Sequence, residues 1–548
     1  MAFLKKNSIL LFFLCWFLLN LLQAGVTELF DDEAYYWVYS KFPAWGYFDH
    51  PPMIALLIKA GYFLFHNELG VRFFITILST ATLIIIYQLL PKKNNGLFFS
   101  IACSMAVLQI GGIIAVPDIP LMFFTAVFFA LYRRFLNKYS IVNALLLGLA
   151  MALLLYSKYH GVLIILFTLI SNLKLFRQPL AYLSAFFTFL LFFPHLLWQF
   201  QHGFPSVQYH LFERNSTGYK FSYTTEYILG QILLAGPLLG WLFLWQSSKY
   251  KTADLFERTL KFCLFGIYGF FLLSSLRGRV EANWTIPALI PLFIISHQAL
   301  LNNDKWKIIL WKLAPVTLVL VLMVRLYMAL DIAPLEWIPK DEFHQNKIWA
   351  NAVKEKAGNL PVVFINSYQK ASKYWFYSGK EAFSLNTPFY RRNNFNYWPI
   401  ESSLKGKKVY AVSFEDFAYF PDTVIQKENK ITKGKIIDSF YSNSGINLQP
   451  VSKMVVVKNQ LLSSSFKIIS GEPKQLPTPF IVYLYVYHSD QVLGFYKMTA
   501  SLVSDSWKMR SNEKIKLAAG KYAARFALPS VIPDMPSLNS TFFKLIVE

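Results

Sequence analysis

Long apolar runs recur through the first 330 residues and constrain the fold more than any other feature of this chain. A transmembrane helix needs about 20 mainly apolar residues, and we count about eleven runs of nearly that length or more. The composition agrees, because 55% of the residues are hydrophobic and the mean hydropathy is +0.38, too apolar for a soluble protein of this length. We therefore predict a polytopic α-helical membrane protein. The runs lie at about 8–25, 70–90, 97–116, 119–136, 141–157, 161–176, 180–200, 222–245, 259–276, 284–301 and 308–330.

The character of the chain changes near residue 331. Long apolar runs stop, and short β-rich runs such as 361–365, 408–412 and 480–487 lie between clusters of Gly, Asn, Ser and Pro. We predict a transmembrane domain over residues 1–330 and a C-terminal soluble domain over residues 331–548. Its first half has an α/β pattern, and the part after about residue 450 has a mostly β pattern.

The distribution of charge predicts the orientation. A net charge of +22 would suggest nucleic acid as the partner of a soluble protein, but here the basic residues gather in one set of loops, which contains Lys92, Arg133 and Lys249. The positive-inside rule assigns that set to the cytoplasm, so no nucleic-acid partner is expected. An odd number of spans then places residues 331–548 outside. Lys5 and Lys6 also fit a cleaved signal peptide, but a retained helix is preferred because a carboxylate motif follows at once.

Three adjacent carboxylates follow the first apolar run. Asp31, Asp32 and Glu33 lie within the segment 30–37, FDDEAYYW. A carboxylate at mid-bilayer costs roughly 2.5 to 3.5 kcal/mol, so acids near membranes gather where they serve ions, protons or catalysis. The alternative is a helix cap, since Asp at the first turn accepts hydrogen bonds from N–H groups that lack partners. A cap explains one acid better than three, which favours a functional site.

A second polar turn comes next in the segment GYFDHPP. Asp49 and His50 stand directly before Pro51 and Pro52. Two prolines fix the backbone and exclude a helix just before them, so the pair is expected on a rigid turn. The alternative is an ordinary proline-started helix that Asp49 caps, which is compatible with a functional role.

Three more polar segments are predicted at the outer ends of spans. They contain Asp118 (116–120), Lys158 (156–160), and Arg277 with Arg279 (277–284). Each alone fits an interfacial anchor, and for Arg277 and Arg279 that alternative is as good as a functional role. However, acids and bases on the same face are what a site for a phosphate leaving group requires.

The order of these motifs resembles a known family. DDEAYYW, GYFDHPP, PDIPLMFF, GLAMALLLYSKYHG, PHLLWQFQHGF and RVEANWTIP are similar to segments of the bacterial family 39 glycosyltransferases of the C-type membrane fold. This family includes protein O-mannosyltransferases and the transferase that adds aminoarabinose to lipid A. The resemblance covers about residues 1–300. It implies transfer of one sugar from a polyprenyl-phosphate donor to a hydroxyl of a lipid, glycan or protein, on the outer face of the bacterial cytoplasmic membrane.

The resemblance also implies residue roles. The family's acidic pair matches Asp32 and Glu33, with Asp32 as the base, and its further catalytic carboxylates match Asp49 and Asp118. Its lysine matches Lys158. The aminoarabinose transferases have Arg and Lys where this chain has Tyr35 and His50, which argues against that sugar and acceptor. The candidates to bind the donor phosphate are His50, Lys158, Arg277 and Arg279.

The chemistry of the reaction agrees with this set. A polyprenyl phosphate is a good leaving group that needs cations or a metal rather than a strong general acid, whereas the acceptor hydroxyl needs a carboxylate base. Some family members bind a divalent metal, which makes Asp49 and His50 candidate ligands. The main alternative function is a transporter or flippase of lipid-linked sugars. Such a protein is expected to show paired repeats or broken spans in corresponding halves, and the sequence shows no such symmetry.

Overall fold

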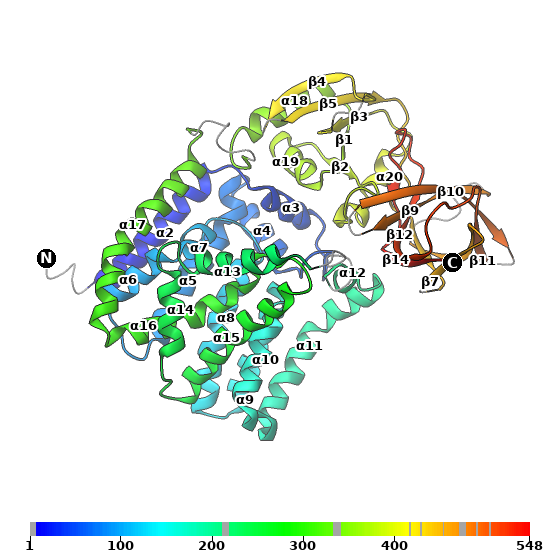
Figure 1. Ribbon diagram of the computed structural model, residues 1–548. Helices are drawn as coiled ribbons and strands as arrows, with labels where there is room; N and C mark the ends of the chain where they lie inside the picture. The colour runs from blue at the N-terminus through cyan, green and yellow to red at the C-terminus, as the bar shows by residue number, and fades with distance from the viewer. Residues whose placement is uncertain are drawn as a thin grey trace. The chain divides into compact units, whose positions relative to one another are not determined.

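The computed structural model describes residues 7–210, 219–332, 341–415, 418–427, 430–452, 454–470, 478–488, 491–503 and 506–548. The chain forms two compact units (Figure 1). The first unit consists of Met1–Ser206 and Tyr219–Ala333, and the second consists of Val207–Gly218 and Pro334–Glu548.

All the regular secondary structure among the described residues of the first unit is helical. Its helices before residue 206 are α2 (Ser8–Val26), α3 (Asp31–Lys41), α4 (Met53–Leu64), α5 (Glu68–Leu89), α6 (Asn95–Ser104), α7 (Ala106–Gly111), α8 (Asp118–Asn137), α9 (Ile141–Ser157), α10 (Gly161–Ser171), η1 (Leu173–Arg177) and α11 (Pro179–Gln201). After residue 219 they are α13 (Phe221–Ala235), α14 (Gly240–Lys249), α15 (Leu255–Ser275), η3 (Ala282–Ala288), α16 (Leu289–Leu301) and α17 (Asp304–Ala329). The short helix α12 (Pro205–Gln208) lies where the chain passes between the two units.

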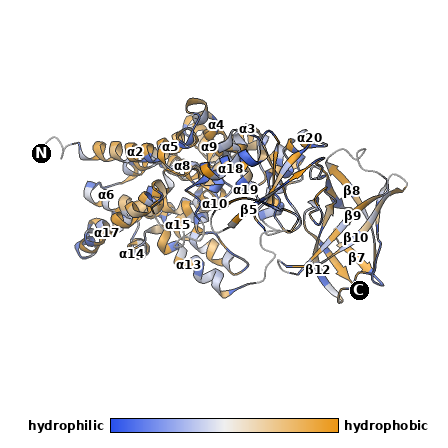
Figure 2. Ribbon diagram, turned by 90° about the horizontal axis from the view of Figure 1, so that it is seen from above, coloured by the Kyte–Doolittle hydropathy of each residue, from blue (hydrophilic) through white to orange (hydrophobic). Residues whose placement is uncertain are grey.

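Six of these helical segments are long and apolar enough to cross a membrane: α2, α5, α8, α11, η3 with α16, and α17. The pair α13 and α14 makes up to seven, with a bend of 91° between the two helices. Hydrophobic residues dominate α2 and α17 in Figure 2. The prediction of a multi-pass helical membrane protein is therefore confirmed. The count of about eleven spans stays a prediction, because α4, α6, α9 and α10 are apolar but shorter.

Two predicted spans are broken in the structure. The run 97–116 divides at Met105 between α6 and α7, and the run 222–245 divides at Gly236 between α13 and α14. The second break has a local cause, since Pro237 follows Gly236 and disfavours helical backbone before it. Met105 carries no comparable signal.

The second unit begins with an α/β part. A five-stranded sheet has the order β2-β1-β3-β5-β4, in which β1 pairs in parallel with β2 and β3 while β5 pairs antiparallel with β3 and β4. The strands are β1 (Val362–Ile365), β2 (Ala382–Leu385), β3 (Val409–Ser413), β4 (Asp422–Lys427) and β5 (Lys430–Ile437). The helices are α18 (Asn346–Ala357), α19 (Tyr368–Ser378), η5 (Asn394–Asn396) and α20 (Ile400–Leu404).

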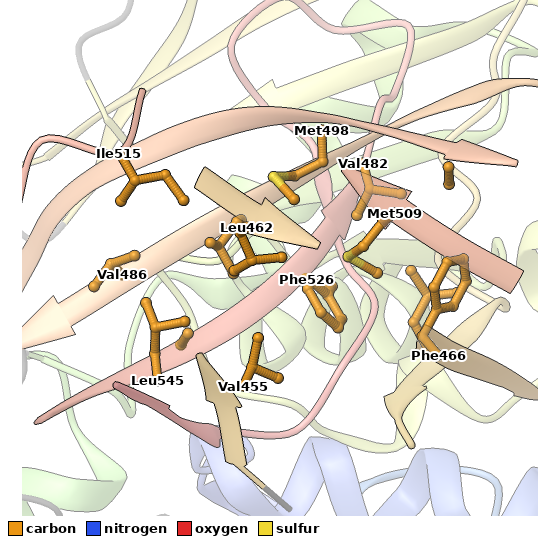
Figure 3. Packing of buried hydrophobic residues seen from close by; sticks show 14 of the residues in the cluster. Val455, Leu462, Phe466, Val482, Val486, Met498, Met509, Ile515, Phe526 and Leu545 are labelled. Carbon is orange, nitrogen blue, oxygen red and sulfur yellow. The ribbon is translucent and has the colours of Figure 1, made fainter. Parts of the chain in front are cut away.

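The rest of the second unit is a closed β-barrel. The strand path β11-β10-β9-β12-β14-β7-β8 closes because β11 also pairs with β8, while β6 extends from β8 and β13 from β12. The bounds are β6 (Asn447–Pro450), β7 (Met454–Lys458), β8 (Leu461–Ser470), β9 (Phe480–His488), β10 (Gln491–Val503), β11 (Ser506–Ser511), β12 (Gly520–Leu528), β13 (Ser537–Leu538) and β14 (Phe543–Val547). Alternate residues such as Val482, Met498, Met509 and Phe526 are buried together in the core (Figure 3). The predicted change from α/β to mostly β near residue 450 is confirmed.

Candidate active site

The acidic motif forms the first turn of α3, with Glu33 at its most enclosed position. Glu33 is fully buried and forms a two-point ion pair with Arg72 of α5, with distances of 2.7 Å from Nε to Oε1 and 2.5 Å from Nη2 to Oε2. The same carboxylate accepts hydrogen bonds from the backbone N–H groups of Phe30 (2.9 Å) and Ala115 (2.6 Å). The helix-cap alternative therefore holds for Glu33, whose bond to Phe30 satisfies the N-terminus of α3.

Arg72 extends this cluster to the end of α2. Its Nη1 donates to the carbonyl oxygens of Ala24 (3.1 Å) and Thr27 (2.6 Å), and its Nη2 donates to that of Glu28 (2.9 Å). Ala115 lies only three residues before Asp118. The Glu33–Arg72 pair therefore joins α2, α3, α5 and the segment that leads into α8. This geometry favours a positioning role for Glu33 over a role as the base.

The two aspartates of the motif differ in exposure. Asp31 is buried at 1% exposure, whereas Asp32 is half-buried. A base must be reachable by the acceptor hydroxyl that it deprotonates, so access favours Asp32 among the three acids. Its position in the first turn of a helix also places it near the positive end of the helix dipole, which stabilises a carboxylate.

Asp49 is held by the same helix. It is buried, and its Oδ2 accepts hydrogen bonds from the hydroxyls of Tyr35 (3.1 Å) and Tyr39 (3.2 Å), one turn apart on α3. Burial, with further contributions from Tyr35 and Asp49, raises the pKa of Tyr39 well above its ordinary value, so Tyr39 remains a neutral donor. Tyr35, which stands where the aminoarabinose transferases have arginine, thus contacts the second acidic motif directly.

His50 follows on the rigid turn and is half-buried. Its backbone carbonyl accepts a hydrogen bond from Tyr47 N–H (3.1 Å), and its ring contacts that of Tyr36 at 5.6 Å between centroids. The helix α4 begins at Met53, directly after the two prolines, as the alternative of a proline-started helix predicts. The motif is therefore a proline-fixed turn that also starts a helix.

Asp118 and Lys158 form a buried ion pair. The Lys158 Nζ lies 2.7 Å from Asp118 Oδ1, and each side chain is 4% exposed. Asp118 is the first residue of α8, and Lys158 follows the last residue of α9. The Asn283 amide of η3 donates to the other carboxylate oxygen at 3.1 Å, so three of the predicted segments meet at Asp118. Lys158 is neutralised by Asp118 here, and an incoming phosphate would compete with Asp118 for it.

A second polar cluster connects the next motifs. The Tyr159 hydroxyl lies 3.2 Å from His195 Nε2 and 3.0 Å from Ser206 Oγ, and it accepts from Gln199 Nε2 at 2.8 Å. His195 Nδ1 lies 2.7 Å from the Trp45 carbonyl oxygen, which only accepts, so Nδ1 carries a proton. Ser206 Oγ donates to the Tyr47 carbonyl at 3.1 Å. The cluster therefore fixes the loop before Asp49 against α11 and the α9–α10 turn.

The two arginines predicted to bind phosphate lie elsewhere. Arg277 and Arg279 are both exposed, and the Arg279 side chain lies 3.9 Å from Glu226 in an exposed pair. Among the described residues, neither arginine hydrogen-bonds through its side chain to Asp118, Lys158 or Asp49. Their position agrees with the anchor alternative, so Lys158 is the better-placed cation.

The predicted metal ligands do not form a ligand cluster. Within the described parts of the chain, Asp49 and His50 belong to no group of three or more His, Cys, Asp or Glu side chains with converging ligand atoms. One carboxylate oxygen of Asp49 already accepts two tyrosine hydroxyls. Metal binding by Asp49 and His50 stays a prediction.

The structure adds residues that the motifs alone did not assign. Arg72, Asn283, Tyr39, Tyr159 and His195 each contact a predicted site residue or its loop. Asn283, Tyr159 and His195 lie inside the quoted motifs, where a polar side chain among apolar residues indicates a functional position. Arg72 lies in the apolar run 70–90, where a lone charge was itself a signal.

Comparisons with known proteins agree with this architecture. Residues 49–198 match the family described as dolichyl-phosphate-mannose-protein mannosyltransferase. The lipid A galacturonosyltransferase RgtD of Rhizobium johnstonii is 22% identical over 289 residues, which are 49% of this chain and 60% of that protein. The alignment thus spans less than two thirds of the relative's length.

The fold comparison covers more of the chain. Crystal structures of ArnT from Cupriavidus metallidurans, bound to undecaprenyl phosphate and in the apo state, match with TM-scores of 0.57 and 0.58 at 13% and 12% identity. Each match covers 78% of this chain and 98% of ArnT. The fold and site thus define a polytopic membrane protein of the C-type glycosyltransferase fold. The predicted resemblance to the family 39 glycosyltransferases is confirmed.

Proposed function

We propose that the protein is a membrane glycosyltransferase that transfers one sugar from a polyprenyl-phosphate donor to a hydroxyl of an acceptor. The observation that carries this proposal is the meeting of separate motifs around one ion pair. Asp118, Lys158 and Asn283 come from three distant segments of the chain and are in direct contact. Glu33 and Arg72 tie the α3 acids to the segment that precedes Asp118.

The proposed roles follow from charge and access. Lys158 interacts with the carrier phosphate as the bond between the sugar C1 and the phosphate oxygen breaks, which stabilises the negative charge of the leaving group. Asp32 accepts the proton of the acceptor hydroxyl as that oxygen attacks C1. Before the donor binds, Lys158 is paired with Asp118. Asp49, held by two tyrosine hydroxyls, fixes the turn that carries His50.

The acceptor is proposed to be a lipid. RgtD is named for transfer to lipid A, and ArnT was crystallised with undecaprenyl phosphate, which supports a lipid-linked donor together with a lipid acceptor. Glycan and protein acceptors have no such support beyond the name of the matched family. Tyr35 and His50 in place of arginine and lysine still argue against aminoarabinose as the sugar.

The membrane orientation is part of the proposal. The loops that contain Lys92, Arg133 and Lys249 face the cytoplasm, and the second unit lies outside. The cytoplasmic membrane of a bacterium is the expected location, because polyprenyl-phosphate sugars are presented at its outer face.

The direct test uses radiolabelled sugar on a polyprenyl-phosphate carrier, added to membranes with and without this protein. We expect a labelled, covalently modified lipid only when the protein is present. A transporter or flippase would instead move the intact donor between leaflets without forming a new product. The names of the matched proteins favour the enzyme. Relocated but chemically unchanged donor would overturn the proposal.

A further inference from the structure

A basic cavity lies at the end of α8 that is opposite Asp118. Helix α8 has 20 residues, which corresponds to a length of about 30 Å, enough to cross the hydrocarbon core of a membrane. The cavity has a volume of about 620 Å³. Its polar lining residues are Arg133, Arg134, Asn137, Lys138, Ser140 and Asn143.

The charge of this cavity is one-sided. Three of its lining residues are cationic, and none is acidic. Arg133 is held in place by a hydrogen bond from Nη1 to the Leu89 carbonyl (3.1 Å) and by the ring of Phe256, 5.4 Å from its guanidinium. Arg134 and Lys138 are exposed, and in the described part of the chain neither side chain pairs with a carboxylate. The cavity therefore offers two cations to an anion from outside.

The lining also includes an acceptor that suits a headgroup. Asn143 is 4% exposed, and its Nδ2 donates to the Lys138 carbonyl at 2.8 Å. Its Oδ1 is buried and accepts no hydrogen bond from the described residues. An acceptor of this kind next to cations matches a ligand that has a hydroxyl as well as a phosphate. A bare inorganic anion would leave Oδ1 unsatisfied.

Apolar side chains beside the cavity suit the rest of a lipid. Ile141 and Val142 are 62% and 60% exposed, and Tyr139 is 47% exposed. In a membrane-spanning unit such residues at a helix end face hydrocarbon or the interface. The helix dipole and the positive-inside rule each favour cations at this end. Neither accounts for the cavity or for the buried acceptor of Asn143.

We propose that this cavity binds the headgroup of an anionic phospholipid of the phosphatidylglycerol type. Arg134 and Lys138 contact the phosphate, and Asn143, whose buried Oδ1 has to turn toward the cavity, accepts from a headgroup hydroxyl. Basic cavities at the membrane end of helices are suited to this chemistry, because each cation near an anionic membrane surface contributes favourably to binding. The site is separate from the candidate active site, so its occupancy is measurable without the transfer reaction.

The test is a titration of the purified full-length protein in detergent with phosphatidylglycerol, followed by native mass spectrometry. Phosphatidylcholine and inorganic phosphate are titrated in parallel. The double variant Arg134→Gln/Lys138→Gln removes both exposed cations, and we expect roughly 25-fold weaker binding, about fivefold for each charge. Asn143→Leu should weaken phosphatidylglycerol binding while it leaves any phosphate binding unchanged. The matched control Lys249→Gln/Lys251→Gln removes two exposed cations outside the cavity and should bind as the parent does.

Several outcomes would overturn the inference. Phosphatidylcholine bound as tightly as phosphatidylglycerol would remove the preference for an anionic headgroup. Equal binding by the Arg134→Gln/Lys138→Gln variant and the parent would place the lipid elsewhere. Inorganic phosphate that competes at the same concentration as the lipid would indicate a free-anion site. Thermal unfolding without added lipid checks that each variant is folded, so a loss of binding is not a loss of fold.

Discussion

Removing the charge of Glu33 should destabilise the helical unit strongly. The Glu33 and Arg72 side chains are 0% and 1% exposed, and the carboxylate accepts four hydrogen bonds that join α3, α5 and the segment before α8. Glu33→Gln keeps the shape but leaves the Arg72 charge buried without its partner. Breaking a buried pair in this way costs about 3 to 5 kcal/mol. At about 2 to 4 °C per kcal/mol for a unit of this size, the unfolding temperature should fall by roughly 6 to 20 °C.

The assay is thermal unfolding of the purified protein in detergent, followed by tryptophan fluorescence. The matched control is Glu226→Gln, because Glu226 pairs with Arg279 at 3.9 Å and both side chains are more than half exposed. An exposed pair contributes at most about 1 kcal/mol, so the control should stay within about 4 °C of the parent. The double variant Glu33→Gln/Arg72→Met removes both charges and should recover part of the loss. Equal unfolding temperatures for Glu33→Gln and the parent would refute the stabilising role of the Glu33–Arg72 pair.

Three further predictions concern the carrier, pH and orientation. Lys158→Ala should raise the KM for the polyprenyl-phosphate donor by at least tenfold. Arg277→Ala and Arg279→Ala should change that KM less than threefold, because only Lys158 contacts the buried Asp118. Equal effects of all three substitutions would contradict the assignment of Lys158 to the carrier phosphate. Because the pKa of Tyr39 is raised in the folded state, its contribution to stability is complete below its ordinary pKa of about 10 and is lost as the pH rises above it. The unfolding temperature of the parent should therefore fall above about pH 10, and that of Tyr39→Phe should fall less. Identical pH profiles for the two proteins would contradict the role of Tyr39 as a neutral hydrogen-bond donor in the folded state. Asn94 and Ser402 are both exposed. In a background without cysteines, Asn94→Cys and Ser402→Cys should react with an impermeant thiol reagent from opposite sides of the membrane. Reaction of both from the same side would contradict the proposed orientation.

The sequence predicted the longest spans well, because apolar length is a local property. The predicted run 70–90 became α5 (Glu68–Leu89), and the run 308–330 became α17 (Asp304–Ala329). Breaks were harder to predict. Gly236 and Pro237 give a visible signal between α13 and α14, whereas nothing in the residues around Met105 indicates the end of α6. Closure of the barrel depends on pairing of β8 with β11, and no short pattern encodes such long-range pairing.

The site was predicted by residue type but not by pairing. The motifs identified Asp118 and Lys158, yet their ion pair joins residues 40 positions apart. The three acids of α3 look equivalent in sequence. Only the position of Arg72, 39 residues beyond Glu33, separates a buried positioning residue from the more accessible Asp32. Tertiary contacts of this kind decide roles that adjacent residues of one motif share.

The most direct test of the account measures sugar transfer by Asp32→Asn. The amide keeps the size of the side chain but is not basic, and Asp32 is the half-buried member of the α3 acids. We expect transfer from the labelled polyprenyl-phosphate donor to fall on the order of 10²-fold or more, with donor binding and the unfolding temperature close to those of the parent. A folded Asp32→Asn protein that transfers sugar at nearly the parent rate would contradict the assignment and move the role of base to Asp49 or Asp118.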